Sequence, residues 1–286
     1  MNKEAIKCTV CPHGCTLIPG ATGRCRSRKN IDGQVVSINY GIVTSLALDP
    51  IEKKPLNRFY PGSRIVSVGS FGCNLDCPFC QNHEIAAAGA KDVLKTDEAD
   101  NYLSPEDLTQ IAVKTKPQGN IGVAFTYNEP LIGYEYVLDT SKLIRAAGLK
   151  TVLVTNGCVT ETTADKILPF TDALNIDLKS FNPYVYRDTL GGDFEAVKDF
   201  IRRAAMQCHV ELTTLIVPGM NDSVDEIIRI SDWIASLPGG DEIPLHVTRF
   251  FPRHRMTDRK PTDVDLILKL SEAAHKKLKY VYPGNI

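Results

Sequence analysis

The chain has 286 residues, of which 43% are hydrophobic and 23% are charged, values typical of a globular protein large enough to bury its own core. This composition excludes a disordered chain, a collagen-like chain and a small disulfide-stapled scaffold. With 33 basic and 34 acidic residues the formal net charge is −1, so no nucleic-acid-binding surface is indicated.

Nine cysteines are the chain's most unusual feature. The sequence has no apolar run near the roughly 18 residues that a membrane span needs, and its amino terminus has no signal-peptide pattern. We therefore expect a cytoplasmic protein with neither a membrane nor a nucleic acid as partner. In a reducing compartment, clustered thiols bind metals more often than they form disulfides. Seven of the nine lie in two clusters: Cys8, Cys11, Cys15 and Cys25, then Cys73, Cys77 and Cys80.

The first 60 residues are expected to form a small cysteine-rich module that wraps onto a main domain of residues 61–286. Four cysteines fall within 18 positions of this module, in the pattern Cys-x2-Cys-Pro-His-x-Cys-x9-Cys. Four thiolates complete a closed tetrahedral site, which would be either structural zinc or an auxiliary iron–sulfur cluster. His13 could replace one thiol as a ligand, and the pattern does not decide between the metals.

From residue 64 onward, short β-branched apolar runs alternate with amphipathic segments. The apolar runs predict strands at 64–69, 121–127, 150–155, 172–177, 210–217 and 245–250. The amphipathic segments predict helices at 104–114, 131–147, 161–168, 193–206, 224–237 and 262–278. Ser104 and Ser223 are suitable N-caps, because each is followed three residues later by an acid. Gly148 is placed to end a helix.

This alternation predicts an α/β fold with a parallel sheet. Two architectures fit: an open doubly wound sheet, or a partial (β/α)6 TIM-like barrel. Neither a dinucleotide fingerprint nor a phosphate-binding loop follows the first strand. Polar residues instead follow most of the strands directly, which is where barrel enzymes carry their chemistry. We therefore favour the partial barrel, with the N-terminal module attached to it.

The loop after the first predicted strand holds the pattern Cys73-x3-Cys77-x2-Cys80. Three thiols on one helical face would be ordinary packing, but Gly72 and Pro78 argue against a continuous helix here. Three thiolates are one ligand short of a closed zinc or cubane site. A [4Fe–4S] cluster held by them would keep one iron open to a chelating small molecule.

This spacing, with the aromatic Phe79 before the last cysteine, resembles the signature of the radical SAM superfamily. The resemblance implies that S-adenosylmethionine (SAM) binds the open iron and is reductively cleaved to a 5′-deoxyadenosyl radical, which abstracts hydrogen from a substrate. It also implies a six-unit barrel over roughly residues 64–252 and an electron donor such as flavodoxin or ferredoxin. No side chain is expected to act as an acid–base catalyst, since the cofactor carries the difficult chemistry.

The same resemblance nominates residues that would contact SAM. Glu129 would hold the SAM amino group, although the family's Gly-Gly-Glu motif is Tyr-Asn-Glu here. Asp177 and Lys179 match an Asp-x-Lys triplet of the pyruvate formate-lyase activating enzymes. The remaining candidates are Thr155, Asn156 and His246. Each candidate also has an ordinary interpretation: an acid before a helix, an ion pair at a strand end, an Asn-Gly turn, or a buried histidine.

Three segments narrow the resemblance: the N-terminal cysteine pattern, residues 49–56 (Asp-Pro-Ile-Glu-Lys-Lys-Pro-Leu), and the terminal Tyr-Val-Tyr-Pro-Gly-Asn-Ile. Together they make the chain similar to the AmmeMemoRadiSam-system radical SAM enzymes, relatives of the pyruvate formate-lyase activating enzymes. A protein or peptide substrate is the expectation, with its identity open. Two alternatives stand: activation of a glycyl-radical enzyme, and a non-catalytic iron–sulfur or zinc scaffold. The two cysteines outside the clusters, Cys158 and Cys208, are expected to be packed thiols.

Overall fold

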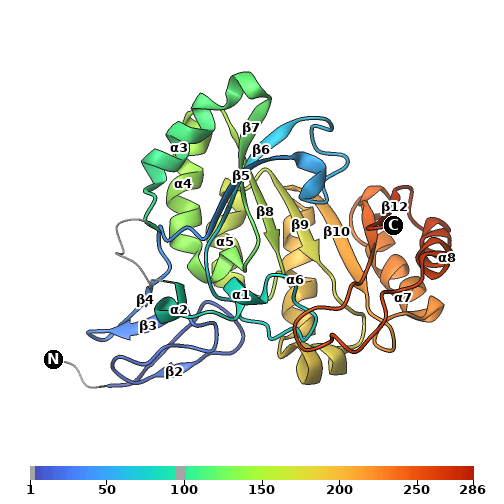
Figure 1. The fold of residues 1–286 in the computed structure, drawn as a ribbon, viewed down its shortest axis with the longest axis horizontal. Helices are drawn as coiled ribbons and strands as arrows, with labels where there is room; N and C mark the ends of the chain where they lie inside the picture. Colours follow the sequence, from blue (N-terminus) through green and yellow to red (C-terminus); the bar gives the residue numbers. More distant parts are fainter. Residues whose placement is uncertain (1–3, 94–100) are drawn as a thin grey trace.

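The computed structural model describes residues 4–93 and 101–286 and is built around one eight-stranded sheet, curved into a partial barrel (Figure 1). The strand order across the sheet is β12-β11-β10-β9-β8-β7-β6-β5. The parallel strands are β6 (Arg64–Gly69), β7 (Asn120–Phe125), β8 (Lys150–Thr155), β9 (Ala173–Asp177), β10 (His209–Ile216), β11 (Leu245–Arg249) and β12 (Val281–Gly284). One edge is completed by β5 (Ser45–Pro50), which runs antiparallel to β6.

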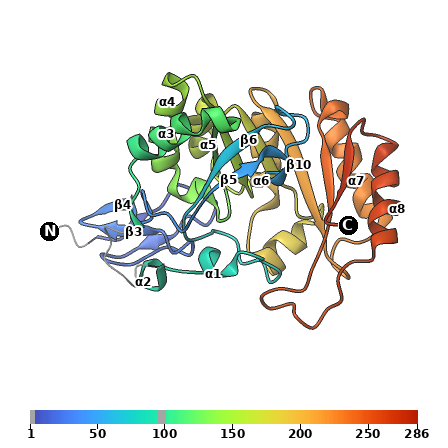
Figure 2. The same ribbon diagram turned by 45° about the horizontal axis from the view of Figure 1, so that its top comes forward.

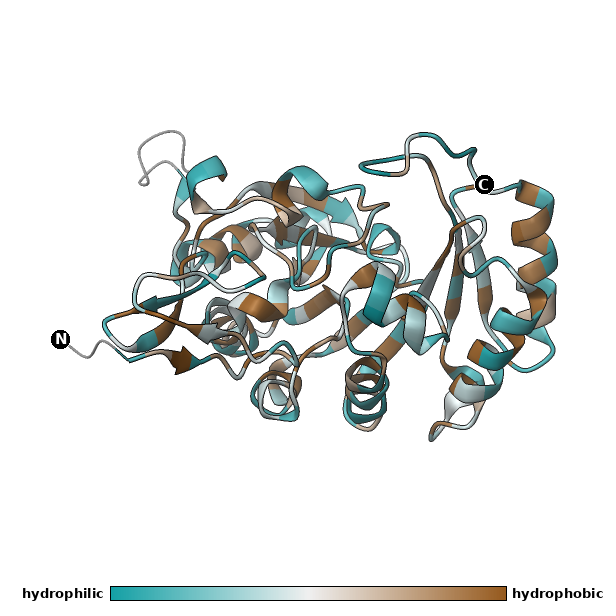
Figure 3. Cartoon of the chain, turned by 90° about the horizontal axis from the view of Figure 1, so that it is seen from below, coloured by the Kyte–Doolittle hydropathy of each residue, from teal (hydrophilic) through white to brown (hydrophobic). Residues whose placement is uncertain are grey.

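Amphipathic helices cover the outer face of the sheet, and helices in Figure 3 carry both brown and teal residues. They are α3 (Pro105–Lys114), α4 (Tyr134–Ala146), α5 (Glu161–Ile167), α6 (Phe194–Ala205), α7 (Val224–Ala235) and α8 (Val264–His275). Short helical turns are α1 (His83–Ala86), α2 (Ala90–Val93), η1 (Ile51–Lys53), η3 (Lys116–Gln118), η4 (Pro130–Gly133), η5 (Leu168–Phe170), η6 (Val185–Leu190) and η7 (Gly240–Glu242). The expected caps are confirmed: Ser104 and Ser223 accept the predicted N–H groups, and Gly148 has φ 68°.

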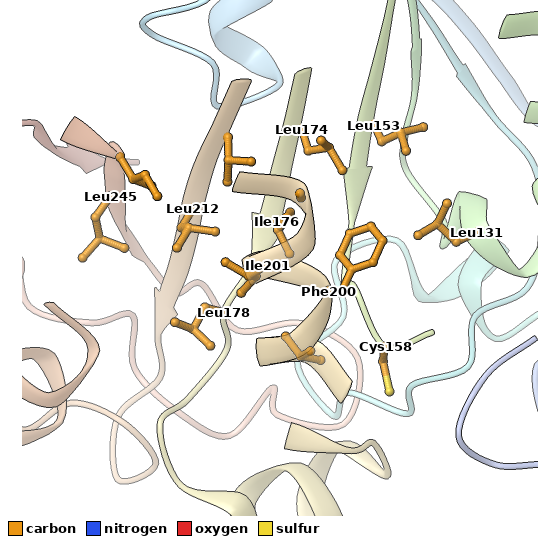
Figure 4. Packing of buried hydrophobic residues seen from close by; sticks show 14 of the residues in the cluster. Leu131, Leu153, Cys158, Leu174, Ile176, Leu178, Phe200, Ile201, Leu212 and Leu245 are labelled. Carbon is orange, nitrogen blue, oxygen red and sulfur yellow. The ribbon is translucent and has the colours of Figure 1, made fainter. Parts of the chain in front are cut away.

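The outer core lies between this helical layer and the strands. Phe200 and Ile201 of α6 lie among Leu153, Ile176 and Leu212 of three neighbouring strands (Figure 4). Burial of this many aliphatic and aromatic side chains supplies the main stabilisation of the fold, at about 25 cal/mol per Å² of apolar surface.

The predicted partial barrel is confirmed, and all six predicted strands are present within two residues of their expected bounds. Two strands of this sheet were missed. The terminal strand β12 pairs in parallel with β11, and β5 pairs with β6 in the same sheet. Residues 45–50 pair with β6 in this sheet, and Ile51 and Leu56 pack against its strands, so this part of the chain contacts the main domain directly.

The end of the barrel where the parallel strands begin is closed by residues 51–59, which follow β5 and which we call the plug. A buried apolar cluster gathers inside the sheet there, formed by Ile51, Leu56, Ile65, Ala124, Val152 and Ala173. Two members come from the plug and four from strands β6 to β9, so the plug closes the bottom of the barrel. The opposite end, where the parallel strands point, stays available for chemistry.

A buried carboxylate fixes this plug to the sheet. Glu211 of β10 is fully buried and accepts hydrogen bonds from the backbone N–H groups of Asn57 (2.9 Å) and Arg58 (2.7 Å). His209 and His246 lie 3.0 and 2.7 Å from the same carboxylate. Burial alone would raise the pKa of Glu211, but these four partners outweigh it and lower the pKa to about 2. The carboxylate is therefore held as an anion with every oxygen paired.

Replacing Glu211 with glutamine is expected to destabilise the fold by roughly 3 kcal/mol near neutral pH, since the folded pKa lies below the ordinary value. A depressed carboxyl pKa contributes stability that is present above about pH 4.5 and is lost as the pH falls toward 2. Urea unfolding of both proteins at pH 6 and pH 3 measures this, and the difference between them should shrink by about 2 kcal/mol at pH 3. An equal difference at both pH values would contradict the assignment.

The N-terminal module consists of two small hairpins. They are β1 (Ile6–Lys7) with β2 (Thr16–Leu17), and β3 (Arg28–Ile31) with β4 (Gln34–Ser37). Arg28 is 2% exposed and binds both carboxylate oxygens of Glu135 on α4 at 2.7 Å, which docks the module onto the helical layer. Within the described residues, no helix is both long and apolar enough to cross a membrane.

Candidate functional site

The cysteine loop after β6 borders a pocket that, with the solvent at its open side, holds about 290 Å³ of empty space. Cys73, Cys77 and Cys80 all line this pocket, together with His83 and His254. All three cysteines are partly buried free thiols. The structure thus brings together three thiols that the sequence pattern had grouped.

Local packing explains why the three thiols share one side of the loop. Leu75 and Phe79, which stand between the cysteines, are each 5% exposed and belong to the main core. Asn74 is fully buried and donates to the carbonyl of Cys158 at 2.6 Å. Phe79 therefore anchors the loop in the core, and the cysteines are left facing the pocket.

The turn into the loop requires glycine. Gly72 has φ 88°, a left-handed conformation, and a Cβ built there would lie 2.5 Å from the carbonyl oxygen of Cys25. Only a residue without a side chain accepts both constraints. The cysteine loop therefore lies directly against the N-terminal module at this point.

Burial disfavours ionisation of the three thiols. It raises the pKa of Cys77 to about 11 and that of Cys73 well above its ordinary value, and the neighbouring thiols add to both shifts. The pKa of Cys80 is also raised by burial, although a backbone N–H and Lys179 oppose the shift. Three thiolates in one pocket repel one another, so a bound cation is needed to hold all of them ionised.

Hydrogen-bond donors are already aimed at the sulfur atoms. The backbone N–H of Leu75 lies 3.4 Å from the sulfur of Cys73, and the side-chain amide of Asn156 lies 3.6 Å from it. Donors of this kind stabilise metal-bound thiolates. In residues 4–93 and 101–286, however, no three Cys, His, Asp or Glu side chains are yet gathered as tightly as a bound metal ion would hold them.

An ion pair stands beside the thiols at the end of β9. The ammonium of Lys179 lies 2.7 Å from the carboxylate of Asp177, and their side chains are 14% and 33% exposed. Burial would lower the pKa of Lys179, but Asp177 and Cys77 outweigh it and raise that pKa. A cation and an anion are thus both available at the mouth of the barrel, next to Cys77.

The carboxylate of Glu129 is already engaged by other groups of the protein. Its carboxylate is 2% exposed and accepts hydrogen bonds from Thr155 (2.7 Å), the N–H of Asn156 (2.7 Å) and the N–H of Leu131 (3.0 Å). Burial outweighs these bonds and raises the pKa of Glu129 to about 7. The side chain therefore ties the turn after β7 to the turn after β8, and Asn156 continues the connection to Cys73.

His246 is not part of the thiol site. It lies near the start of β11, bonded to Glu211 in the plugged end of the barrel. The parallel strands carry the thiols and the Asp177–Lys179 pair at their opposite, carboxyl ends. The prediction that His246 contacts SAM has no geometric support, and the buried-packing interpretation describes it.

Two residues that replace the family's glycines also shape the site. Tyr127 has φ 72°, which is uncommon for a side chain of this size, and its hydroxyl donates to Asp49 at 2.9 Å. Asn128 accepts from the N–H of Ser70 at 3.0 Å and donates to the carbonyl of Gly72 at 3.1 Å. Sequence reasoning gave these two positions no role. Asn128 connects the loop after β7 to the cysteine loop, whereas the side chain of Tyr127 connects it to β5.

A pair of histidines at the pocket was missed entirely. The rings of His83 and His254 stack with centroids 4.6 Å apart. His83 follows Cys80 by three residues, whereas His254 arrives from the segment after β11. No sequence spacing connects them, so only the fold could reveal the contact.

The four N-terminal cysteines lie together in the module. Cys8, Cys11 and Cys25 are buried, and the thiols of Cys8, Cys15 and Cys25 all affect the ionisation of Cys11. Burial, with help from the other thiols, raises the pKa of Cys11 to about 11. The Nε2 of His13 is engaged elsewhere, because it lies 2.8 Å from the carbonyl oxygen of Asn74 in the barrel's cysteine loop.

Comparison with known proteins agrees with this geometry. A family model described as the radical SAM superfamily matches residues 67–233. The chain is 36% identical over 288 residues to the uncharacterized protein MJ0808 of Methanocaldococcus jannaschii, covering all of this chain and 83% of that one. It is 26% identical over 217 residues to the pyruvate formate-lyase-activating enzyme of Clostridium pasteurianum, covering 74% and 84% of the two chains.

Solved structures share the fold at low sequence identity. SuiB of Streptococcus suis superposes with a TM-score of 0.57 at 14% identity, over 77% of this chain and 48% of SuiB, about half its length. QueE of Escherichia coli gives a TM-score of 0.50 at 15% identity, over 85% of this chain and 92% of QueE. At these identities the likeness concerns the fold alone.

Proposed function

The chain belongs to the radical SAM superfamily, and from that premise we propose that it cleaves SAM at the pocket lined by Cys73, Cys77 and Cys80 and oxidises a protein or peptide substrate. One observation carries the proposal: the three thiols share a pocket beside the partly buried Asp177–Lys179 ion pair at the carboxyl end of the barrel. The geometry supports this function better than a scaffold role, because the site is open to a small molecule.

The three thiols fit a [4Fe–4S] cluster, with donors to sulfur already present and one iron left without a protein ligand. When bound with SAM, such a cluster supplies the electron that releases methionine and a 5′-deoxyadenosyl radical. The chain's own residues position the reactants. The buried core around Leu75 and Phe79 fixes the loop and limits access of water to it.

Two groups at the strand ends suit the polar parts of SAM. Lys179 can hold the methionyl carboxylate as a point charge, and Asp177 can hold the amino group. Glu129, Thr155 and Asn156 act indirectly rather than by contact with SAM. They bond to each other and fix the turn that faces Cys73. We assign these three a positioning role.

The substrate assignment rests on relatives. Pyruvate formate-lyase-activating enzymes, by name, act on another protein, and one structure of SuiB is described with a bound precursor peptide. The motifs at residues 8–25 and 49–56 support placing the chain with the AmmeMemoRadiSam-system enzymes. The relation to the activating enzymes keeps activation of a glycyl-radical enzyme as a second candidate, tested by a glycyl radical that forms only when the partner enzyme is added.

We also propose that Cys8, Cys11, Cys15 and Cys25 hold a second metal. Backbone N–H groups two residues ahead, those of Val10 and His13, bond to the sulfurs of Cys8 and Cys11, which is a pattern that favours metal-bound thiolate. Closed four-thiolate sites hold zinc or an iron–sulfur cluster. Because His13 bonds to Asn74 instead, we propose that all four ligands of this metal are sulfur atoms.

Anaerobic purification followed by reduction with SAM present tests the function. We expect 5′-deoxyadenosine and methionine in equal amounts, and a change in the EPR signal of the reduced protein when SAM is added. Elemental analysis on the same sample separates the metals: about eight irons per chain indicate two cubanes, and about four irons with one zinc indicate a mixed protein. Sulfide-free protein, or reduced protein that leaves SAM intact, would support the scaffold alternative instead.

A further inference from the structure

A strongly basic surface segment lies beside the cysteine pocket. Residues 251–262, which we call the basic strap, connect β11 to α8. They carry four cationic side chains, Arg253, Arg255, Arg259 and Lys260, against the single carboxylate of Asp258. All four cations are exposed, in a chain whose total charge is −1. The strap is therefore locally rich in positive charge, although the chain as a whole is nearly neutral.

The strap is attached to the cysteine loop itself. The N–H of Arg255 donates to the carbonyl of Pro78 at 2.9 Å, and its guanidinium donates to the carbonyl of Asp76 at 2.7 Å. His254 stacks on His83 and lines the same pocket as Cys80. Figures 1 and 2 show the strap, in orange-red, beside the teal segment that leads into α1. A molecule bound to the strap would thus sit next to the thiols.

Most of this charge is uncompensated. Arg255 pairs with Asp76 at 3.1 Å, but across residues 4–93 and 101–286 no carboxylate lies within ion-pair distance of Arg253, Arg259 or Lys260. Arg259 donates only to the backbone carbonyl of Pro218. Three free cations on one exposed segment attract an acidic surface and accelerate its encounter at low salt.

We propose that the basic strap is the docking surface for an acidic one-electron donor protein of the flavodoxin or ferredoxin class. The inference rests on the proposed function, in which each SAM cleavage requires one electron from outside. The docked donor would lose one electron, and a cluster held by Cys73, Cys77 and Cys80 would gain it. A partner seated on the strap is close to Cys77 and Cys80, because Arg255 contacts the backbone on either side of Cys77.

A charge-reversal variant with two kinds of reductant tests the proposal. In R253E/R259E/K260E, with its cluster in place, 5′-deoxyadenosine formation is measured without substrate, using reduced flavodoxin or dithionite. We expect the flavodoxin-driven rate to fall roughly 10- to 100-fold at low salt, with the dithionite-driven rate unchanged. Added salt should slow the wild type with flavodoxin and leave the variant almost unaffected.

The ratio of the flavodoxin-driven rate to the dithionite-driven rate is compared, because poorer folding of the variant would lower both rates alike. A matched control, K114E/K269E/K276E, reverses three exposed lysines at the end of α3, on α8 and directly after α8, and should keep the wild-type ratio. An unchanged ratio in the strap variant overturns the docking proposal, including the case in which the strap binds an acidic substrate instead. Wild-type protein that makes no 5′-deoxyadenosine even with dithionite would instead overturn the proposed function.

Discussion

Replacing Cys77 with alanine is expected to reduce SAM cleavage to background. Cys77 is the middle thiol of the pocket, and the ionisation of Cys73 is affected by it. Two remaining thiols are too few to hold a [4Fe–4S] cluster with one open iron, so the cofactor that supplies the electron would be lost. Iron and sulfide analysis, the EPR spectrum after reduction, and 5′-deoxyadenosine yield together measure the effect.

Cys208→Ala is the matched control for this loss. Cys208 is a partly buried free thiol near the carbonyls of Leu168 and Thr171, outside both clusters. Its removal should leave iron content and cleavage unchanged, at a stability cost of about 1 kcal/mol for the lost packing. If Cys77→Ala protein retained cleavage, the assignment of the ligands would be wrong.

The barrel itself could be predicted because its signals are local. Six β-branched runs, each followed by an amphipathic segment with a recognisable cap, indicate parallel strands and crossover helices. The strands β5 and β12 lacked that context. The antiparallel β5 precedes the repeating pattern, and β12 contains Pro283 and is only four residues long, so its pairing with β11 depends on the finished sheet.

The cysteine loop could be predicted for a similar reason, since its three thiols lie within eight positions of the sequence. Contacts between distant segments could not. His254 meets His83 across more than 170 residues of chain, and Arg255 meets Asp76 across a similar distance. Nothing in the spacing of these residues indicates the contact, which follows from the path of the strap after β11.

Residue type alone could not predict the intramolecular partners of two of the polar candidates, His246 and Glu129. His246 lies in strand β11, but the sequence does not show which end of the barrel its side chain serves. The register of the strands shows that it lies beside Glu211 in the plugged half. Glu129 has the right position but its carboxylate is already used by Thr155 and Asn156. A buried acid with this many donors organises the backbone before it can bind a ligand.

The three donors around Glu129 make this side chain important for the stability of the fold. Glu129→Ala removes the acceptor for three donors, namely the hydroxyl of Thr155 and the N–H groups of Asn156 and Leu131. An unpaired buried donor costs about 1–3 kcal/mol, so we expect the free energy of unfolding to fall by roughly 3 kcal/mol or more. Urea unfolding in the absence of SAM measures this loss, and Glu195→Ala, at an exposed acid on α6, should change it by less than about 0.5 kcal/mol.

The same variant distinguishes positioning from direct SAM contact. If Glu129 sets the turn that carries Asn156, its loss weakens SAM binding through the cysteine loop, and Thr155→Val, which removes one donor and leaves the carboxylate, should reproduce part of both effects. If Glu129 instead bound the SAM amino group directly, Glu129→Ala would unfold like the wild type and lose only SAM affinity. Thr155→Val would then bind SAM normally. Isothermal titration of SAM into both anaerobically reconstituted variants, together with the unfolding data, decides between these outcomes, because a carboxylate engaged by three internal donors cannot be removed without a cost to the fold.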